Sequence, residues 1–273
     1  MKRKKIILGF TLIEMIIAIG IMGMLSGLAA SALVNIMKGQ KIINITHSAL
    51  EDAEIVIGLL SAEIQNNAVD YEEYYNWNIF GYHFGANYGE YAKTMKNGAV
   101  KGKNAIECYY EACYRTYLAL ISPDGKTKKI FAPEYNKSLD ERVLSVLELK
   151  GCDGDNDGVA EKFVRMEESC ETAEGGNITD AELTTVNTNG PYGGDFNPMS
   201  TMKTNIVDLK FFVTPVNDPH KAYAMPEYVY QPKVTIVLKI KPSKSYFGNA
   251  AEKAAPITVY KTVSPRFTDE VKS

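Results

Sequence analysis

The sequence predicts an α+β fold in which one long N-terminal helix packs on an antiparallel β-sheet. Apolar residues recur every three or four positions as far as residue 64, which is the period of an α-helix. Beyond residue 117, short apolar runs are separated by turn-forming residues, which is typical of strands. With 273 residues, of which 45% are apolar and 23% charged, the chain is long enough to bury a core in one domain.

The N-terminal segment is long and apolar enough to cross a membrane. Four cations at residues 2–5 precede 32 residues, Ile6 to Met37, that contain a single charge, Glu14. About 20 apolar residues in a helix cross a hydrocarbon core about 30 Å thick. The cations lie before this run, so the positive-inside rule places the N-terminus in the cytoplasm and residues 38–273 outside it.

Glu14 is an unusual residue for such a segment. A carboxylate inside the membrane costs roughly 2.5–3.5 kcal/mol on insertion scales, so it indicates a function and a partner. Neither a plain signal anchor nor a secretory signal peptide, with its apolar stretch of about 7–15 residues, accounts for it. Cleavage before Phe10 would create an α-amino group one helical turn from Glu14. In an assembly, the carboxylate of one subunit would then meet the amino group of its neighbour.

The segment Gly9-Phe10-Thr11-Leu12-Ile13-Glu14 resembles the leader-peptidase site of type IV pilins and of type II secretion pseudopilins. All six motif positions match, and so do the basic leader before them and the apolar helix after them. The resemblance implies that a prepilin peptidase removes residues 1–9 and methylates the new N-terminal Phe10. It also implies that Glu14 guides docking into a growing filament. It covers about 40 residues and leaves the rest of the chain unassigned.

The family therefore implies a structural protein, not an enzyme: a minor pilin or pseudopilin with a pilin-like fold. By resemblance, its partners are other minor and major pilins or pseudopilins, the inner-membrane assembly platform and membrane lipid. Residues 10–37 would form the membrane-spanning and filament-core helix, and residues 38–273 an extracytoplasmic domain. The size of the chain, and a looser resemblance of residues 233–240 and 263–266 to the tip-forming J class of pseudopilins, favour a place at the tip. The alternatives are an adhesin or a hydrolase tethered by an uncleaved signal anchor.

The helix is expected to continue beyond the membrane, over residues 38–67, and to stop at Asn66-Asn67. One face is apolar and the other polar, the polar side including His47, Asp52 and Glu63. The apolar face is formed by Ile42, Ile45, Ala49, Ala53, Val56, Leu60 and Ile64.

Strands are expected after residue 117, with Pro123-Asp124-Gly125 as the turn between the first two. Five prolines, at 215, 219, 232, 242 and 256, stand at strand borders, where a sheet tolerates them. Residues 69–105 are rich in Tyr and either form an aromatic contact surface or fold their rings back over the core. The expected strands are Tyr117–Ile121, Lys129–Ala132, Val143–Leu149, Glu161–Glu168, Ile206–Thr214, Val234–Ile240 and Ile257–Val263.

An acidic loop at residues 153–161 resembles a DxDxDG calcium loop. Alternating carboxylates in a tight turn bring hard oxygen ligands together, which suits Ca²⁺. The position of the bidentate Glu of an EF-hand is occupied by Val164, so the loop is not a full EF-hand. An acidic turn without metal is the alternative. The candidate ligands are the side chains of Asp153, Asp155, Asp157 and Glu161 and the carbonyl of Val159.

The four cysteines are compatible with an oxidising compartment. Of the three possible pairings we favour Cys108–Cys113 with Cys152–Cys170, the second of which would close the acidic loop. A zinc site is the weaker alternative, because no His stands at ligand spacing.

The sequence lacks the common catalytic motifs HExxH, GxSxG, the P-loop and GxGxxG. The carboxylate pairs Glu72-Glu73 and Glu167-Glu168 are expected to be solvated, and His47 to be a surface residue. The net charge of −3 argues against a general nucleic-acid surface.

Overall fold

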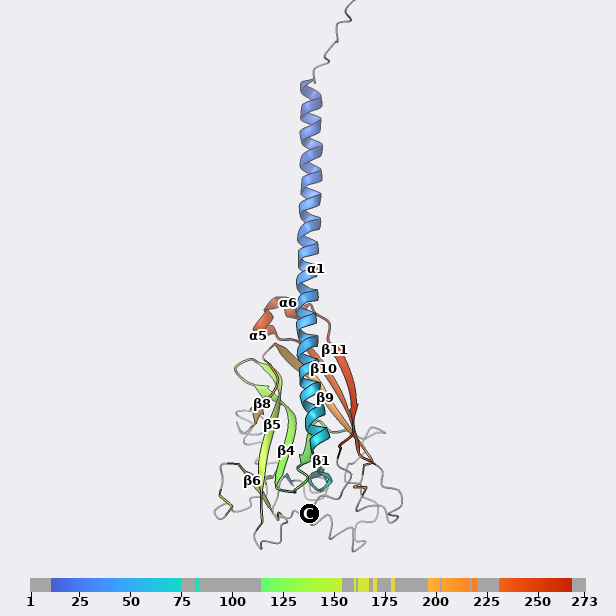
Figure 1. Ribbon diagram of the computed structural model, residues 1–273. Helices are drawn as coiled ribbons and strands as arrows, with labels where there is room; N and C mark the ends of the chain where they lie inside the picture. The colour runs from blue at the N-terminus through green and yellow to red at the C-terminus, as the bar shows by residue number, and fades with distance from the viewer. Residues whose placement is uncertain are drawn as a thin grey trace, which may run out of the picture.

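The computed structural model combines one long helix with antiparallel sheets, as the sequence predicts (Figure 1). For residues 82–83, 162 and 178–179 it describes the backbone only. It describes residues 11–74, 114–153, 160, 162–166, 169–170, 196–201, 203–216, 218–219 and 231–266.

Helix α1 runs without interruption from Leu12 to Asn66, 55 residues in all. Its first half projects away from the rest of the protein, and its second half lies against the sheets (Figure 1). The expected stop at Asn66-Asn67 is confirmed, because Asn67 has an extended backbone and caps the last turn. The Asn67 side-chain amide donates to the Glu63 carbonyl at 2.9 Å and to the Glu63 carboxylate at 3.0 Å. The backbone N–H of Asn67 donates to the same carbonyl at 3.1 Å, so the side chain reinforces the last hydrogen bond of the helix.

The buried face of α1 follows the predicted apolar period. Ala49 and Ala53 are fully buried, and their small side chains let the helix approach the sheets closely. Asp52 departs from the prediction, since it is buried and not solvated. Its carboxylate accepts hydrogen bonds from the hydroxyls of Thr201 and Thr204, which offset the cost of burying it. The other buried residues of α1 are Ile45, Val56, Ile57, Leu60 and Ile64.

The larger sheet has six strands, in the order β1-β3-β4-β5-β6, with β8 also paired to β5. Neighbouring strands are antiparallel throughout. The predicted turn at Pro123-Asp124-Gly125 joins β3 to β4, and Gly125 has a φ of 71°, which favours glycine. The strands are β1 (Ala68–Val69), β3 (Leu118–Ile121), β4 (Thr127–Asn136), β5 (Glu141–Cys152), β6 (Lys162–Arg165) and β8 (Asn197–Pro198).

A second sheet of three strands has the order β11-β10-β9. The single sheet expected from the sequence is thus wrong, since periodicity identifies strands but not the sheet that each one joins. Two short helices between β10 and β11 were not predicted either. The elements are β9 (Thr204–Thr214), β10 (Lys233–Pro242), α5 (Lys244–Phe247), α6 (Asn249–Glu252) and β11 (Ile257–Val263). Strands β2 (Tyr82–His83) and β7 (Ile178–Thr179) pair separately.

Both sheets share one hydrophobic core with the second half of α1. The helix packs on β9, β10 and β11, and β5 packs on β9 (Figure 1). Phe131 of β4 and Phe211 of β9 are fully buried in this core. A backbone bridge between Arg115 and Phe211 also links the chain before β3 to β9.

Strand β4 continues through Pro133, although the sequence predicts that the strand ends at Ala132. Pro133 lies opposite Leu144 of β5. The N–H and carbonyl of Leu144 bond to Ser200 and Met199, on the other side of β5. The backbone nitrogen of Pro133 therefore faces away from β5, toward the side of β4 where β3 lies. The pairing of β3 with β4 stops at Phe131, so the lack of an N–H at Pro133 costs no hydrogen bond of the sheet.

Candidate assembly and membrane-anchoring site

The projecting half of α1 is apolar around its whole circumference. Residues 12–37 extend about 39 Å at 1.5 Å per residue, enough to cross a hydrocarbon core about 30 Å thick. The apolar stretch of the helix is not buried against any described part of the protein. By length and composition it is a candidate membrane span. Its exposed large side chains are Leu12, Ile13, Met15, Ile16, Ile17, Ile19, Ile21, Met22, Met24, Leu25, Leu28, Leu33, Val34, Ile36 and Met37.

Glu14 lies in the first turn of α1 and forms a capping box with Thr11. Its carboxylate accepts hydrogen bonds from the Thr11 N–H at 2.8 Å and from the Thr11 hydroxyl at 2.9 Å. The Glu14 N–H donates to that hydroxyl at 3.4 Å. The carboxylate is therefore held at the very start of the helix. Gly9 and Phe10 themselves lie outside the described residues.

The capping box explains the position of the Glu14 side chain, but it does not explain why a charged residue occurs in an apolar segment. The positive end of the helix dipole stabilises a carboxylate in the first turn. An amino group from a second chain would be a stronger partner, because it carries a full charge. The capping role of Glu14 follows from the Thr-x-x-Glu spacing, a signal that our reading of the sequence did not use.

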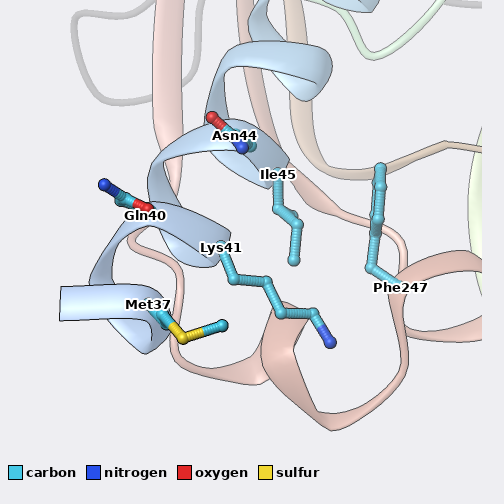
Figure 2. A pocket seen from close by; sticks show the side chains of 6 residues that line it. All are labelled: Met37, Gln40, Lys41, Asn44, Ile45 and Phe247. Carbon is cyan, nitrogen blue, oxygen red and sulfur yellow. The ribbon is translucent and has the colours of Figure 1, made fainter. Parts of the chain in front are cut away.

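A hollow of about 350 Å³ lies where α1 leaves the globular domain. It is lined by five residues of α1 between Met37 and Ile45, and by Phe247 of α5 (Figure 2). Phe247 thus lies beside the first two turns of α1 that follow the apolar stretch. Next to it, the ring of Tyr246 is 59% exposed. Lys41 lines the hollow together with Phe247, and lysines and aromatic rings near the end of an apolar span are typical of the membrane–water boundary.

The predicted disulfide between Cys152 and Cys170 is present, with its Cα atoms 5.6 Å apart. It joins the end of β5 to the chain after β6, and so closes the acidic loop. Asp153 is exposed at the start of that loop. Residues 154–159 and 161, with the other candidate calcium ligands, lie outside the described residues, as do Cys108 and Cys113. Within the described part of the chain, no group of three or more His, Cys, Asp or Glu side chains is arranged to hold a metal ion.

Two tyrosines of the Tyr-rich region fold into the core. The Tyr71 hydroxyl donates to the Pro215 carbonyl at 2.9 Å. Tyr74 is fully buried and stacks on Tyr117, with ring centroids 5.3 Å apart. Burial raises the pKa of the Tyr74 hydroxyl, which accepts a hydrogen bond from the Ala119 N–H at 3.0 Å. Of the two alternatives for this region, these two rings follow the one in which the rings fold back over the core. The rings of residues 75–105 lie outside the described residues.

The prediction that Glu72 and Glu73 are solvated is wrong, since both are buried. Glu73 lies 2.8 Å from the ammonium of Lys128, a residue that is also fully buried. Burial alone would lower the pKa of Lys128, but the charges of Asp70 and Glu73 outweigh it and raise that pKa. Sequence reasoning missed this cluster because Lys128 on β4 lies 55 or more positions away from its two carboxylate partners, Asp70 and Glu73. His47, in contrast, is exposed as expected and lies 3.1 Å from Glu51.

Comparisons with protein-family models, curated proteins and solved structures found no match for this chain.

Proposed function

We propose that this protein is a minor pilin or pseudopilin, a structural subunit that assembles into a pilus or pseudopilus after its leader is removed. One observation carries the proposal: an exposed apolar helix, with a carboxylate in its first turn, continues unbroken into a folded domain. A helix that only anchored an enzyme would need neither the carboxylate nor the rigid continuation.

Membrane insertion would be the first step. The apolar span of α1 would lie in the inner membrane, with the basic N-terminus in the cytoplasm and the sheets outside. Lys38 and Lys41 follow the span, and Phe247, the neighbour of the exposed Tyr246, lines the hollow with Lys41. The boundary of the lipid would therefore fall at the hollow between α1 and α5. A headgroup layer of roughly 5–7 Å on that side would reach these residues.

Assembly would follow cleavage after Gly9. The same apolar surface that contacts lipid would then pack against the helices of other pilins or pseudopilins. Small residues along the span, Gly20, Gly23 and Gly27, have open space around them, so a neighbouring helix can approach closely there. Glu14 would meet the new amino group of a neighbouring subunit, which offsets the cost of its charge in an apolar environment.

Photo-crosslinking in the native membrane tests this proposal. A photoreactive residue at Met22, which is 68% exposed on the span, should form crosslinks to other proteins that carry an N-terminal apolar helix. The same probe at Lys126, on the exposed β3–β4 turn at the other end of the domain, serves as the control. Crosslinks from Met22 to lipid alone, in cells that express the assembly machinery, would contradict a filament role and favour a simple anchor.

A further inference from the structure

Lys128, Asp70 and Glu73 form a cluster of charges that water does not reach. Their side chains are 0%, 1% and 0% exposed. The Lys128 Nζ lies 2.9 Å from Asp70 Oδ2 and 2.8 Å from Glu73 Oε2. Lys128 and Lys129 are neighbours on β4, so they point to opposite faces of the sheet. Lys129 reaches Glu63 on α1, and Lys128 reaches the cluster on the other face.

The backbone holds the two carboxylates in place. The Asp70 N–H donates to the Ala119 carbonyl at 3.1 Å, and the Ala119 N–H donates to the Tyr74 hydroxyl at 3.0 Å. Both ends of the segment 70–74 are thus fixed to the middle of β3. Position and orientation are determined before any reaction, and for well-oriented groups this is equivalent to an effective concentration of about 10⁵–10⁸ M.

The two carboxylates have different environments. Asp70 Oδ1 accepts a hydrogen bond from the Glu73 N–H at 3.0 Å, which polarises the Asp70 carboxyl group and would stabilise negative charge that develops on that oxygen. Glu73 Oε2 accepts a hydrogen bond from the Lys128 ammonium, the position expected of a base. The Lys128 Nζ also lies 4.5 Å from the centre of the Phe163 ring, which covers the cluster with apolar surface.

We propose that Lys128 and Asp70 condense spontaneously to form an isopeptide bond inside the folded protein, with Glu73 as the proton carrier. Glu73 takes a proton from the Lys128 ammonium, and the neutral amine attacks Cγ of Asp70. A C–N bond forms and one C–O bond of the carboxyl group breaks. Glu73 returns its proton, the Lys128 nitrogen gives up a second one, and the oxygen leaves as water. Ammonium and carboxylate become amide and water, no oxidant or cofactor is needed, and Glu73 ends unchanged.

Burial favours the product. Two opposite charges in an apolar interior carry a desolvation cost of several kcal/mol each, which their attraction only partly repays. The amide replaces the charges of Lys128 and Asp70 by a neutral group, and the Glu73 carboxylate is the charge of the three that remains. The bond would join the segment after α1 to β4 and close a covalent loop over residues 70–128. Force applied along α1 would then reach the sheet through a covalent bond near Asn67.

Mass spectrometry of the purified full chain tests the proposal. After reduction of disulfides, the intact mass should be lower by one water molecule than the mass calculated for a chain with the same N-terminus, with the leader present or removed. Proteolysis should yield a branched peptide that joins Asp70 to Lys128. Lys128→Arg should restore the full mass, whereas the adjacent Lys129→Arg should keep the loss of water. Glu73→Gln should reduce the linked fraction at least tenfold.

The wild-type digest decides the question even if a variant does not fold. Recovery of residues 70 and 128 in separate, unmodified peptides from folded protein would overturn the proposal. A bond from Lys128 to Glu73 would overturn the roles assigned to the two carboxylates. Full linkage in Glu73→Gln would show that Glu73 does not carry the proton, and would likewise overturn its role.

Discussion

Glu63, in the last turn of α1, lies 3.1 Å from the ammonium of Lys129 on β4. Lys129 also lies 3.3 Å from Glu148 on β5, and Glu63 accepts a hydrogen bond from Asn67, the residue that ends the helix. One ion pair therefore connects the end of α1 to the centre of the larger sheet.

A double-mutant cycle with Glu63→Gln and Lys129→Met should give a coupling energy of about 0.5–1 kcal/mol, because both side chains are about a quarter exposed. Desolvation lowers the pKa of Lys129, but Glu63 and Glu148 outweigh it and raise that pKa. The contribution is therefore complete below the usual lysine pKa and is lost as the pH rises through the higher folded value. Denaturant unfolding at pH 7 and at a pH above the raised folded pKa of Lys129 measures both effects. A coupling that is unchanged at high pH would refute the ion pair.

Glu134 should cause a second pH effect, which arises from desolvation of a carboxyl group and not from an ion pair. Desolvation raises the pKa of this buried carboxyl to about 8, and its Oε1 accepts no hydrogen bond within the described part of the chain. The unfolded chain ionises near pH 4.5, whereas the folded protein keeps the proton until about pH 8. Stability should therefore fall as the pH rises from 4.5 to 8. Glu134→Gln should flatten the pH dependence of the midpoint in urea, and Glu54→Gln, on the exposed side of α1, is the matched control. Equal slopes in all three proteins would contradict the prediction.

Glu14→Gln and Thr11→Val separate docking from helix capping. Glu14→Gln removes the charge that a neighbouring amino group would meet, whereas Thr11→Val keeps the charge and removes the hydroxyl contact. Loss of an N-cap costs about 1 kcal/mol, which a helix of 55 residues tolerates. We therefore expect copurification with partner subunits to fall at least fivefold for Glu14→Gln and to stay near wild type for Thr11→Val. Equal defects in the two variants would show that capping alone matters.

Calcium remains a prediction from the sequence. Asp153, Asp155, Asp157 and Glu161 bring four negative charges into one loop, and a divalent cation would relieve their repulsion. At a ligand concentration 100 times the dissociation constant, binding stabilises the folded state by about 2.7 kcal/mol. The protein should melt at a higher temperature in millimolar Ca²⁺ than in chelator, and Mg²⁺ should do less.

Replacing Asp153 and Asp155 together by Ala is the control for calcium, and should remove the difference. If the wild-type protein melts at the same temperature in Ca²⁺ and in chelator under oxidising conditions, the loop is only an acidic turn held by the disulfide.

Local pattern was enough to predict α1, its end and the strand β11, whose bounds match the prediction residue for residue. These elements are long and periodic, and turn or cap residues bound them. The disulfide between Cys152 and Cys170 was also predictable, since it needed only the choice among three pairings.

Tertiary arrangement was not predictable in the same way. Gly151 is one example, because a Cβ there would lie 2.6 Å from the Ala160 Cβ, a contact between segments that periodicity does not reveal. Burial of Asp52 and Glu73 depends on hydroxyl or ammonium partners 55 or more positions away in the sequence. A polar residue on an otherwise polar face gives no signal of such a partner. In the candidate site, Glu14 could be singled out from the sequence as a charge in an apolar segment, whereas the boundary formed by α1 and α5 required the fold.

The mass and N-terminal sequence of the mature chain, isolated from its own membrane, test the filament account most directly. The account predicts that the chain begins at Phe10 with a methylated amino group, and that Gly9→Val, which places a bulky side chain at the cleavage site, leaves residues 1–9 attached. A wild-type chain that retains Met1 and its basic leader in cells with an active prepilin peptidase would contradict it.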